Sequence, residues 1–257
     1  MNPRFQILDH NGLRLLVYRP WWEEGFLHGM TLGPISFGGD ALTASARELY
    51  GVTGLSMLAN PQQTHGDRFF DARSAANVAA LISPERSLLR FGEYDGVIAP
   101  RNQNVPGERV GYAISTADCV PVVLRGSTGW GLVHPGWRGL ANGIIGKVAH
   151  GLGEVVEAAI FACAGGEVYE VGSEVIEAIG KTASYRAATN GKFLLDTAET
   201  AAAQLRTVLF SEAIEKSGIC TIRDQRFHSH RRDGEHAGRS ITFVAPSRQG
   251  AVVGHTP

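Results

Sequence analysis

Short apolar runs in the middle of the chain have the composition of β-strands. Residues 109–116, 119–124 and 130–134 are rich in Val, Ile and Tyr and are bounded by Gly, Asp or Pro. Residues 155–162 and 240–245 have the same character. The pattern predicts strands in these segments, with 119–124 either a strand of its own or a continuation of 109–116.

The apolar period becomes helical after Gly139. Apolar side chains then recur every four residues, at Leu140, Ile144, Val148 and Leu152. This spacing places them on one face of a helix. A second helix is predicted over residues 168–179.

Residues 196–217 carry the strongest helical signal. Asp196 can cap the N-terminus, and Glu199 lies three residues further on, close to a capping-box arrangement. Gly218 stands where glycine commonly ends a helix. We therefore predict one long helix that ends before Gly218.

The first 60 residues show less periodicity than the rest. Residues 25–39 contain five glycines, which predicts mostly loop with short strands. No internal repeat or linker divides the chain, so we expect a single domain over residues 1–257. Strands and helices do not alternate regularly, and the predicted fold class is therefore mixed α/β.

Composition excludes several classes of function. Apolar residues make up 44% of the 257 residues and charged residues 19%, which is typical of an ordered globular chain. The net charge of -1 lacks the basic excess of a nucleic-acid-binding protein. No apolar run reaches the roughly 18 residues that span a membrane, and the N-terminus does not resemble a secretory signal. Three cysteines, an odd and small number, predict a reducing, cytoplasmic environment.

Three potential metal ligands lie at the ends of apolar or strand-like runs, next to Gly or Pro segments. They are His65, Cys119 and His134. Two imidazoles and one thiolate suit Zn²⁺, and three protein ligands leave a fourth position open, as in catalytic zinc sites. Water bound there would have a pKa near neutrality. The three residues are therefore candidates for both metal binding and catalysis.

Other interpretations of these residues stay open on the sequence alone. A histidine beside a strand is more often a hydrogen-bonded residue than a ligand, and these three residues are too far apart to form a local motif. A His₂Cys set also suits blue copper, which favours a weak axial methionine. The only methionines, Met1, Met30 and Met57, are remote from Cys119 and His134 in sequence.

Neighbouring polar residues indicate a binding site beside these ligands. Arg138 lies just before the predicted helix, whose N-terminus attracts anions, and could bind phosphate or the ribose side of a ligand. Gln63 would share a strand face with His65 and could bond a base or a water. Asp118 could orient a ligating imidazole, carry a proton or fix its own turn.

The segment of residues 227–234 is basic, with His228 and His230 in the alternation that would place both on one strand face. A second metal site there is one interpretation. Arginines that bind phosphate or brace a loop over the pocket are another, and a solvated turn is the third. Cys163 and Cys220 lack such flanking motifs, and we expect buried thiols without chemistry.

Several segments together resemble the YfiH/laccase-domain family. They are Gln63-Thr64-His65-Gly66, Asp95-Gly96-Val97-Ile98, Thr116-Ala117-Asp118-Cys119-Val120-Pro121, His134-Pro135-Gly136-Trp137-Arg138-Gly139, Tyr169-Glu170-Val171-Gly172 and Ser229-His230-Arg231-Arg232-Asp233-Gly234. The resemblance covers about residues 60–245, and the order of the linked motifs is specific. Members of this family are also described as polyphenol oxidases, peptidoglycan editing factors and purine nucleoside phosphorylases.

The resemblance implies a fold, a metal and an activity. The fold is a single α/β domain of stacked mixed β-sheets flanked by helices, with Zn²⁺ held by His65, Cys119 and His134. The activity is phosphorolysis of purine nucleosides, including methylthioadenosine, and deamination of adenosine. The expected partners are a purine nucleoside and phosphate, with no nucleic acid and no membrane. A monomer and a homodimer both stay open.

The resemblance leaves a choice between reactions. The sequence supplies metal ligands but no evident Glu general base, so phosphorolysis ranks ahead of deamination. A copper-dependent, laccase-like polyphenol oxidase is the alternative. Multicopper sites need paired His-x-His segments, whereas this chain has 9 histidines and one such pair. Editing of cell-wall precursors is a third interpretation, and no residue tests it.

Overall fold

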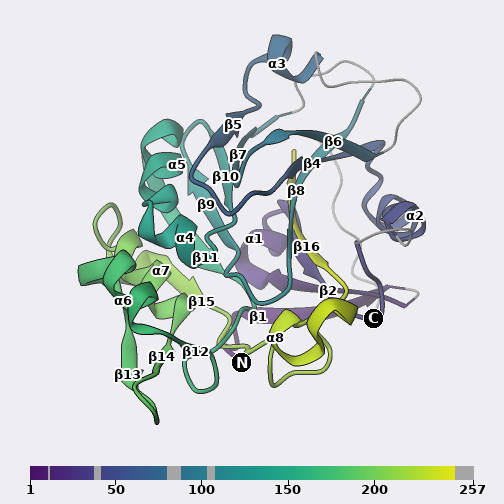
Figure 1. The fold of residues 1–257 in the computed structure, drawn as a ribbon. Helices are drawn as coiled ribbons and strands as arrows, with labels where there is room; N and C mark the ends of the chain where they lie inside the picture. The colour runs from purple at the N-terminus through teal and green to yellow at the C-terminus, as the bar shows by residue number, and fades with distance from the viewer. Residues whose placement is uncertain (11, 38–41, 80–87, 103–107, 247–257) are drawn as a thin grey trace.

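A computed structural model describes the chain except for residues 11, 38–41, 80–87, 103–107 and 247–257. The described residues form two large sheets stacked against each other, a small third sheet and flanking helices (Figure 1). The predicted class, stacked mixed β-sheets flanked by helices, is confirmed.

The larger sheet has seven strands in the order β1-β2-β3-β16-β8-β4-β6. Their bounds are β1 Phe5–His10, β2 Leu13–Tyr18, β3 Leu27–Thr31, β4 Met57–Gln62, β6 Leu88–Glu93, β8 Val110–Thr116 and β16 Ser240–Ala245. β4 runs parallel to both β6 and β8, while β16 runs antiparallel to β8. The ends of β6, β4 and β8 therefore lie at one edge, where β16 begins.

The second large sheet has six strands in the order β15-β11-β9-β10-β7-β5. Their bounds are β5 Phe69–Asp71, β7 Gly96–Pro100, β9 Val122–Gly126, β10 Gly129–Val133, β11 Val155–Ile160 and β15 Ile214–Lys216. β10 is antiparallel to β7, so the end of β10 lies beside the start of β7. This arrangement brings residue 134 next to residue 95.

The third sheet and the helices cover the second large sheet and the outer face of the first. The sheet pairs β12 Glu170–Val171, β14 Phe193–Leu195 and β13 Tyr185–Ala187. The α-helices are α1 Arg19–Glu23, α2 Leu42–Thr53, α3 Ala75–Ala79, α4 Trp137–Ala141, α5 Ile144–Leu152, α6 Ser173–Ile179, α7 Thr197–Leu205 and α8 His230–Asp233. The 3₁₀ turns are η2 Gly180–Thr182, η3 Ser211–Ala213 and η4 Gly234–His236.

Three apolar cores hold these layers together. The first lies between the two large sheets and contains Tyr112 and Leu132, both fully buried. The second lies between the six-stranded sheet and helices α5 and α7 and includes Leu152 and Leu205. The third packs α2 against the seven-stranded sheet. Full burial of one such side chain contributes about 1.5–3 kcal/mol, so the cores give the strand ends a firm support.

Most predicted strands are confirmed, and several boundaries are wrong. β8, β10 and β16 lie where the apolar runs predict them, whereas β9 begins three residues later than predicted. The helix predicted after Gly139 starts at Trp137 and is broken at Gly143, whose φ of 70° no helical residue adopts. Residues 25–39 contain β3 as the expected short strand, and the last two glycines lie outside the described residues.

Two predicted helices are shorter than the pattern suggests. Residues 168–179 form β12 before α6, because the chain pairs with β14 there. α7 starts as predicted, since the Asp196 carboxylate accepts a hydrogen bond from the Glu199 N–H, but it ends at Leu205. Val208 and Phe210 beyond it are 46% and 85% exposed, so their apolar side chains mark no buried helix face. The chain instead enters β15 and pairs with β11.

Among the described residues, no helix is long and apolar enough to cross a membrane.

Candidate functional site

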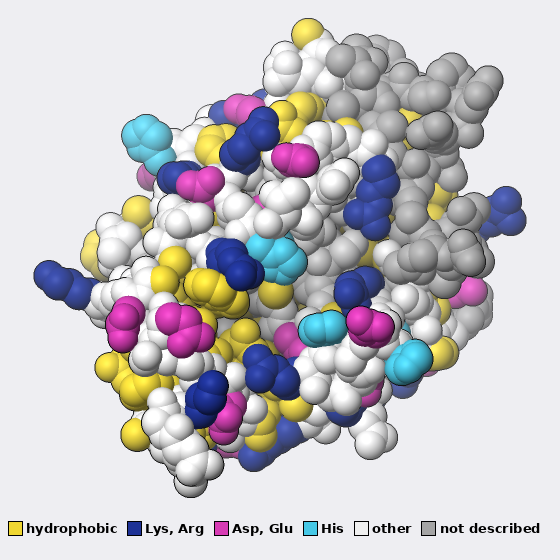
Figure 2. Space-filling view, viewed as in Figure 1, with side chains coloured by type: hydrophobic (Ala, Val, Ile, Leu, Met, Phe, Trp, Pro, Cys, Tyr) yellow, Lys and Arg dark blue, Asp and Glu magenta, His cyan; other side chains and the backbone are white. Residues whose placement is uncertain are grey.

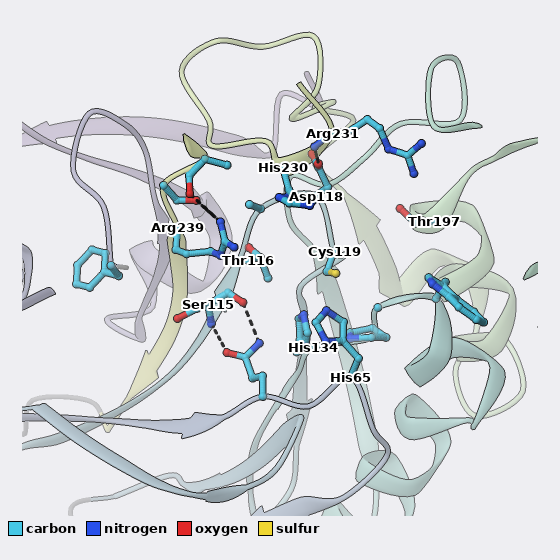
Figure 3. Close-up of a pocket in the computed structure, with 18 of the residues that line it drawn as sticks. His65, Ser115, Thr116, Asp118, Cys119, His134, Thr197, His230, Arg231 and Arg239 are labelled. Atoms are coloured by element: carbon cyan, nitrogen blue, oxygen red, sulfur yellow. Dashed lines mark hydrogen bonds between the residues drawn. The ribbon is translucent and has the colours of Figure 1, made fainter. Parts of the chain in front are cut away.

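The three predicted metal ligands meet where strands of both large sheets end. His65 follows β4 and Cys119 follows β8, and these parallel strands end at the same edge. His134 follows β10 of the second sheet. One ligand atom of each residue lies within 4.8 Å of the others, and Figure 3 shows the three side chains converging.

Asp95 connects the two sheets at this edge. It lies between β6 and β7 and is fully buried. Its carboxylate accepts hydrogen bonds from the backbone N–H groups of Thr64 (3.2 Å), His65 (3.0 Å) and Gly66 (2.7 Å). It also accepts a hydrogen bond of 2.8 Å from His134 Nδ1. One side chain therefore positions two of the three ligands.

The contact with Asp95 also sets the chemistry of His134. Because Nδ1 donates its hydrogen to the carboxylate, the lone pair of the neutral ring lies on Nε2, where it can bind a metal. Burial alone would raise the pKa of Asp95, but the hydrogen bond and charge of His134 lower it. Asp95 has no predicted role, although it begins one of the segments that resemble the family and directly precedes an apolar strand.

Two residues next to the ligand atoms have left-handed backbone conformations. The φ angles are 59° for His65 and 93° for Asp118. Such non-glycine residues cost on the order of 1–3 kcal/mol and persist where their surroundings hold them. Asp95 holds the first, and the carboxylate of Asp118 accepts bonds from the Thr221 hydroxyl (2.6 Å) and the Arg231 N–H (2.7 Å). The strain is therefore concentrated on the two segments that carry His65 and Cys119.

The electrostatics of the site favour a thiolate. Burial by itself would raise the pKa of Cys119, but the charge of His134 and hydrogen bonds from His134 and His65 lower it. Burial would likewise lower the pKa of His134, while the Cys119 thiolate and Asp95 raise it. The negative form of Cys119 and the positive form of His134 therefore stabilise each other.

The donor set and the space around it fit a metal ion. The group of His65, Cys119 and His134 could hold a metal, since a thiolate and two imidazoles are ligands of zinc and copper. Gly136 is needed beside them, because a Cβ there would lie 2.8 Å from His65 Cδ2 and 3.3 Å from the Cys119 sulfur. Any larger residue would push two ligands out of place.

The three ligands line a cavity of about 930 Å³. This volume lies in the range of small-molecule binding sites. Figure 2 shows Lys, Arg and His side chains around a hollow in the middle of this face. The pocket walls come from both large sheets and from the segment around α8.

Arg138 lines the pocket, but not in the predicted setting. α4 begins at Trp137, so Arg138 lies inside its first turn and does not precede it. The guanidinium stacks over the Trp137 ring, with its carbon 4.3 Å from the ring centroid. The arginine therefore extends an aromatic surface on this wall of the pocket.

Gln63 also lines the pocket and is held by the backbone of Ser115. Its Nε2 donates to the Ser115 carbonyl oxygen (2.8 Å), and its Oε1 accepts from the Ser115 N–H (2.7 Å; Figure 3). The amide continues the pairing of β4 with β8 beyond the last strand residues. The second hydrogen on Nε2 is the one that a ligand could meet.

The contacts of Asp118 and of the basic segment, residues 227–234, differ from several that the sequence suggests. The imidazole partner is Asp95, whereas the Asp118 carboxylate binds the two segments that carry Thr221 and Arg231. His228 and His230 do not share a strand face, as a second metal site there would require, because His230 begins α8 and the Ser229 hydroxyl caps it. Arg231 braces the pocket wall, since its side chain donates to the Glu170 carbonyl oxygen.

The other two cysteines are not part of the ligand group among the described residues. Cys163 is buried, and this burial raises the pKa of its thiol to about 12. Cys220 is half-buried, pairs with Cys163 in an isolated parallel bridge and accepts a hydrogen bond from the Gly165 N–H. The raised pKa of Cys163 keeps its thiol protonated and unreactive.

Two relatives of known sequence share the name purine nucleoside phosphorylase. The chain is 36% identical to a purine nucleoside phosphorylase of Aquifex aeolicus over 187 residues, covering 70% of this chain and 79% of the relative. It is 39% identical to a purine nucleoside phosphorylase of Xylella fastidiosa over 144 residues. That match covers 51% of this chain and 55% of the relative, so it spans only about half of the Xylella protein.

Solved structures share the fold at low sequence identity. YlmD from Geobacillus stearothermophilus superposes with a TM-score of 0.79 at 22% identity, covering 95% of this chain and 99% of YlmD. The hypothetical protein YfiH from Bacillus licheniformis gives a TM-score of 0.75 at 21% identity, covering 93% and 100%. Residues 40–247 match the family described as multi-copper polyphenol oxidoreductase laccase. The chain therefore belongs to this laccase-domain family, the YfiH family that its sequence motifs resemble.

Proposed function

We propose that this protein is a zinc-dependent purine nucleoside phosphorylase. The observation that carries the proposal is the likeness to the Aquifex relative of that name, over a region that includes most of this chain. The cavity of about 930 Å³ is large enough for a nucleoside and an anion together. The proposed ligands of Zn²⁺ are His65, Cys119 and His134.

The proposed chemistry depends on how this chain holds its substrates. When bound, Zn²⁺ supplies a Lewis acid beside the substrate. Asp95 keeps the proton of His134 on Nδ1, so that Nε2 faces the ligand group. Trp137 and Tyr169 line the pocket and offer aromatic faces on which a purine could stack. Arg138 and Gln63 are the proposed contacts to the nucleoside.

Deamination of adenosine and phosphorolysis of methylthioadenosine belong to the same proposal as further activities of this pocket. Deamination requires an activated water and a group that carries its proton. The described carboxylates that line the pocket are Asp118 and Glu235, and the first is already engaged by two donors. We therefore rank phosphorolysis first.

A copper-dependent polyphenol oxidase is the second candidate, because the family description names that activity. Among the described residues, one group of three His or Cys ligands is present, whereas multicopper chemistry needs several. Met30 and Met57 are buried in the core between the sheets. These observations favour zinc.

The test combines metal analysis with a substrate panel. Protein purified without added metal is expected to contain about one zinc per chain, given one three-ligand site. Purine nucleosides are then incubated with and without phosphate while free base and ammonia are measured. Base release that depends on phosphate supports the proposal. Stoichiometric copper with an intense thiolate-to-copper absorption band, or no base release from any nucleoside, contradicts it.

A further inference from the structure

Four arginines line the pocket and none forms an ion pair within the described part of the chain. They are Arg90, Arg138, Arg231 and Arg239. The described acidic residues of the pocket are Asp118, which is bound by a hydroxyl and a backbone N–H, and Glu235, which is exposed. The pocket therefore has an excess of positive charge, which favours an anionic ligand.

The four arginines fall into two pairs with different surroundings. Arg138 stacks over Trp137 and Arg231 over Tyr169, with carbon-to-centroid distances of 4.3 and 4.8 Å. Both aromatic rings pack against the core between the six-stranded sheet and its helices. These arginines therefore belong to an aromatic wall, built on the second sheet.

Arg90 and Arg239 belong to the opposite wall, built on the seven-stranded sheet. Arg90 lies in β6 and pairs with Asn60 in β4, whose amide donates to the Ser115 hydroxyl in β8. Arg239 directly precedes β16, in which Ser240 pairs with Thr116 of β8.

The register of this sheet lets the two arginines approach each other. By alternation along the strands, Arg90, Asn60, Ser115 and Arg239 share one face of the sheet. Strands β6 and β16 are three strand spacings apart, about 14 Å, and Arg239 lies about four residues, or ~13 Å, further along the strand direction than Arg90. Both side chains line the same cavity, so two long arginines can approach one anion from opposite ends of this span.

Both guanidinium groups have N–H donors that are not used in short hydrogen bonds to described residues. Arg239 donates from Nη1 to the carbonyl oxygens of Ala237 (2.8 Å) and Gly238 (2.9 Å), and Arg90 has only contacts of 3.5 Å to Asn60 and Pro61 oxygens. Partial burial of Arg90, without a compensating carboxylate among the described residues, lowers its pKa.

A hydroxyl at the end of β8 also lacks a partner among the described residues. Thr116 is 2% exposed and lines the pocket, yet its Oγ1 meets no hydrogen-bond partner among the described residues. Figure 3 shows Thr116, Ser115 and Arg239 on one side of the three ligands and Thr197 on the other. Thr116 alternates with Ser115 along β8 and so lines the pocket from the other side of that strand; a buried hydroxyl without a partner among the described residues indicates a polar ligand there.

We propose that Arg90 and Arg239 bind the phosphate substrate, with Thr116 as a further donor, on the wall opposite Trp137 and Tyr169. This inference rests on the proposed phosphorylase function. It assigns the aromatic wall to the purine and the arginine wall to the phosphate, with the ligand group between them. A phosphate oxygen then forms a bond to ribose C1′ as the bond from C1′ to the purine nitrogen breaks. The bond electrons leave with the purine, which gains the proton that hydrogen phosphate loses.

The test is phosphate binding by variants in which one guanidinium is replaced. Inorganic phosphate is titrated into the zinc-loaded protein and followed by ³¹P NMR, without nucleoside. Arg90→Met and Arg239→Met are each expected to weaken phosphate binding about ten-fold or more, because each removes charge-assisted hydrogen bonds. Arg239→Lys should recover part of the affinity, since it keeps the charge but not the planar fork. Arg186→Met, an exposed arginine in β13, is the matched control and should bind phosphate as the unaltered protein does.

Steady-state kinetics separates this inference from the function on which it rests. In phosphorolysis, both Met variants should raise the KM for phosphate at least as strongly as the KM for the nucleoside. If phosphorolysis occurs and both variants keep the phosphate affinity and KM of the unaltered protein, the assignment to Arg90 and Arg239 is wrong. If no nucleoside is cleaved but phosphate binding still depends on both arginines, the anion site stands and the phosphorylase proposal fails.

Discussion

Replacing Asp95 with Asn tests whether one buried carboxylate organises the candidate metal centre. The two side chains have nearly the same size, but an amide presents one oxygen and one NH₂ in place of two acceptor oxygens. In Asp95, Oδ2 accepts from Thr64 and Gly66, and Oδ1 accepts from His65 and His134. In either orientation the NH₂ of Asn therefore faces two N–H donors.

The structure indicates which orientation costs less. If the NH₂ occupies the Oδ1 position, His134 can move its proton to Nε2 and accept at Nδ1. Only the N–H of His65 then lacks an acceptor, at a cost of about 1–3 kcal/mol. The opposite orientation leaves two backbone N–H groups unpaired and costs about twice as much. We therefore expect the free energy of unfolding of metal-free Asp95→Asn to fall by about 1–3 kcal/mol.

The cheaper orientation has a consequence for the metal. His134 with its proton on Nε2 cannot ligate through the nitrogen that faces Cys119. Loss of such an outer partner typically costs 10–100-fold in metal affinity, so we expect a decrease of about that size. Zinc affinity is measured by competition with a chromophoric chelator, and stability by urea unfolding of the metal-free protein.

Asp118→Asn is the matched control. Asp118 is also buried beside a ligand and also has a left-handed conformation. Its partners are the Thr221 hydroxyl, which can accept from an amide NH₂, and the Arg231 N–H, which can donate to the amide oxygen. Asn can therefore satisfy both, and the change should be nearly neutral in stability and zinc affinity. Equal zinc affinities of Asp95→Asn and Asp118→Asn would refute the role given to Asp95.

The pH dependence of stability gives an independent measure of the same carboxylate. The pKa of Asp95 in the folded protein is lower than in the unfolded chain, where it is about 3.9. Its contribution to stability is therefore present above about pH 4 and is lost as the pH falls through the folded value. Urea unfolding of the metal-free protein should show this loss, and Asp95→Asn should show less of it.

Three further outcomes follow from the site. Cys119→Ser should abolish zinc binding and activity, whereas Cys163→Ser and Cys220→Ser should keep both, as measured by elemental analysis and base release. Zinc binding near neutral pH should release about one proton, because Cys119 must bind as thiolate and His134 as neutral imidazole, and the proton that the pair holds on sulfur or on the ring must leave. Calorimetry in buffers of different ionisation enthalpy measures this number. Arg138→Lys should weaken nucleoside binding by a few-fold, by loss of a stacking contact of about 0.5–1 kcal/mol with Trp137, and leave the phosphate KM unchanged.

The ligand group could be predicted because each member stands at a strand end. The apolar runs that become β8 and β10 fix where Cys119 and His134 leave the sheets, and the family motifs supply His65. Local patterns also predict strands well here, since the buried runs are bounded by Gly, Asp and Pro. What the patterns do not contain is the parallel pairing of β4 with β8, which brings His65 and Cys119 to one edge.

The predictions that were wrong depend on long-range pairing. α7 ends at Leu205, and after a turn the chain reaches β15, which pairs with β11 in another part of the sequence; no local signal in residues 206–213 indicates that partner. The role of Asp95 depends on the contact of β7 with β10, some 35 residues further along, which brings it to His134. Asp118 was a reasonable candidate for that contact, since it adjoins a ligand in sequence.

Asp95 and Asp118 hold different segments of the site, for a physical reason. Asp95 and Asp118 each stabilise a segment that contains a residue with positive φ, and each segment carries one ligand. Without the two carboxylates, metal binding would have to offset the backbone strain of both segments. Because the carboxylates already hold the segments, the ligands are in place before a metal binds. Gly136 completes the arrangement, since it leaves room for two ligands where any Cβ would collide. The geometry of the ligand group is therefore set by buried hydrogen bonds and packing, which accounts for a site formed by three residues so distant in sequence.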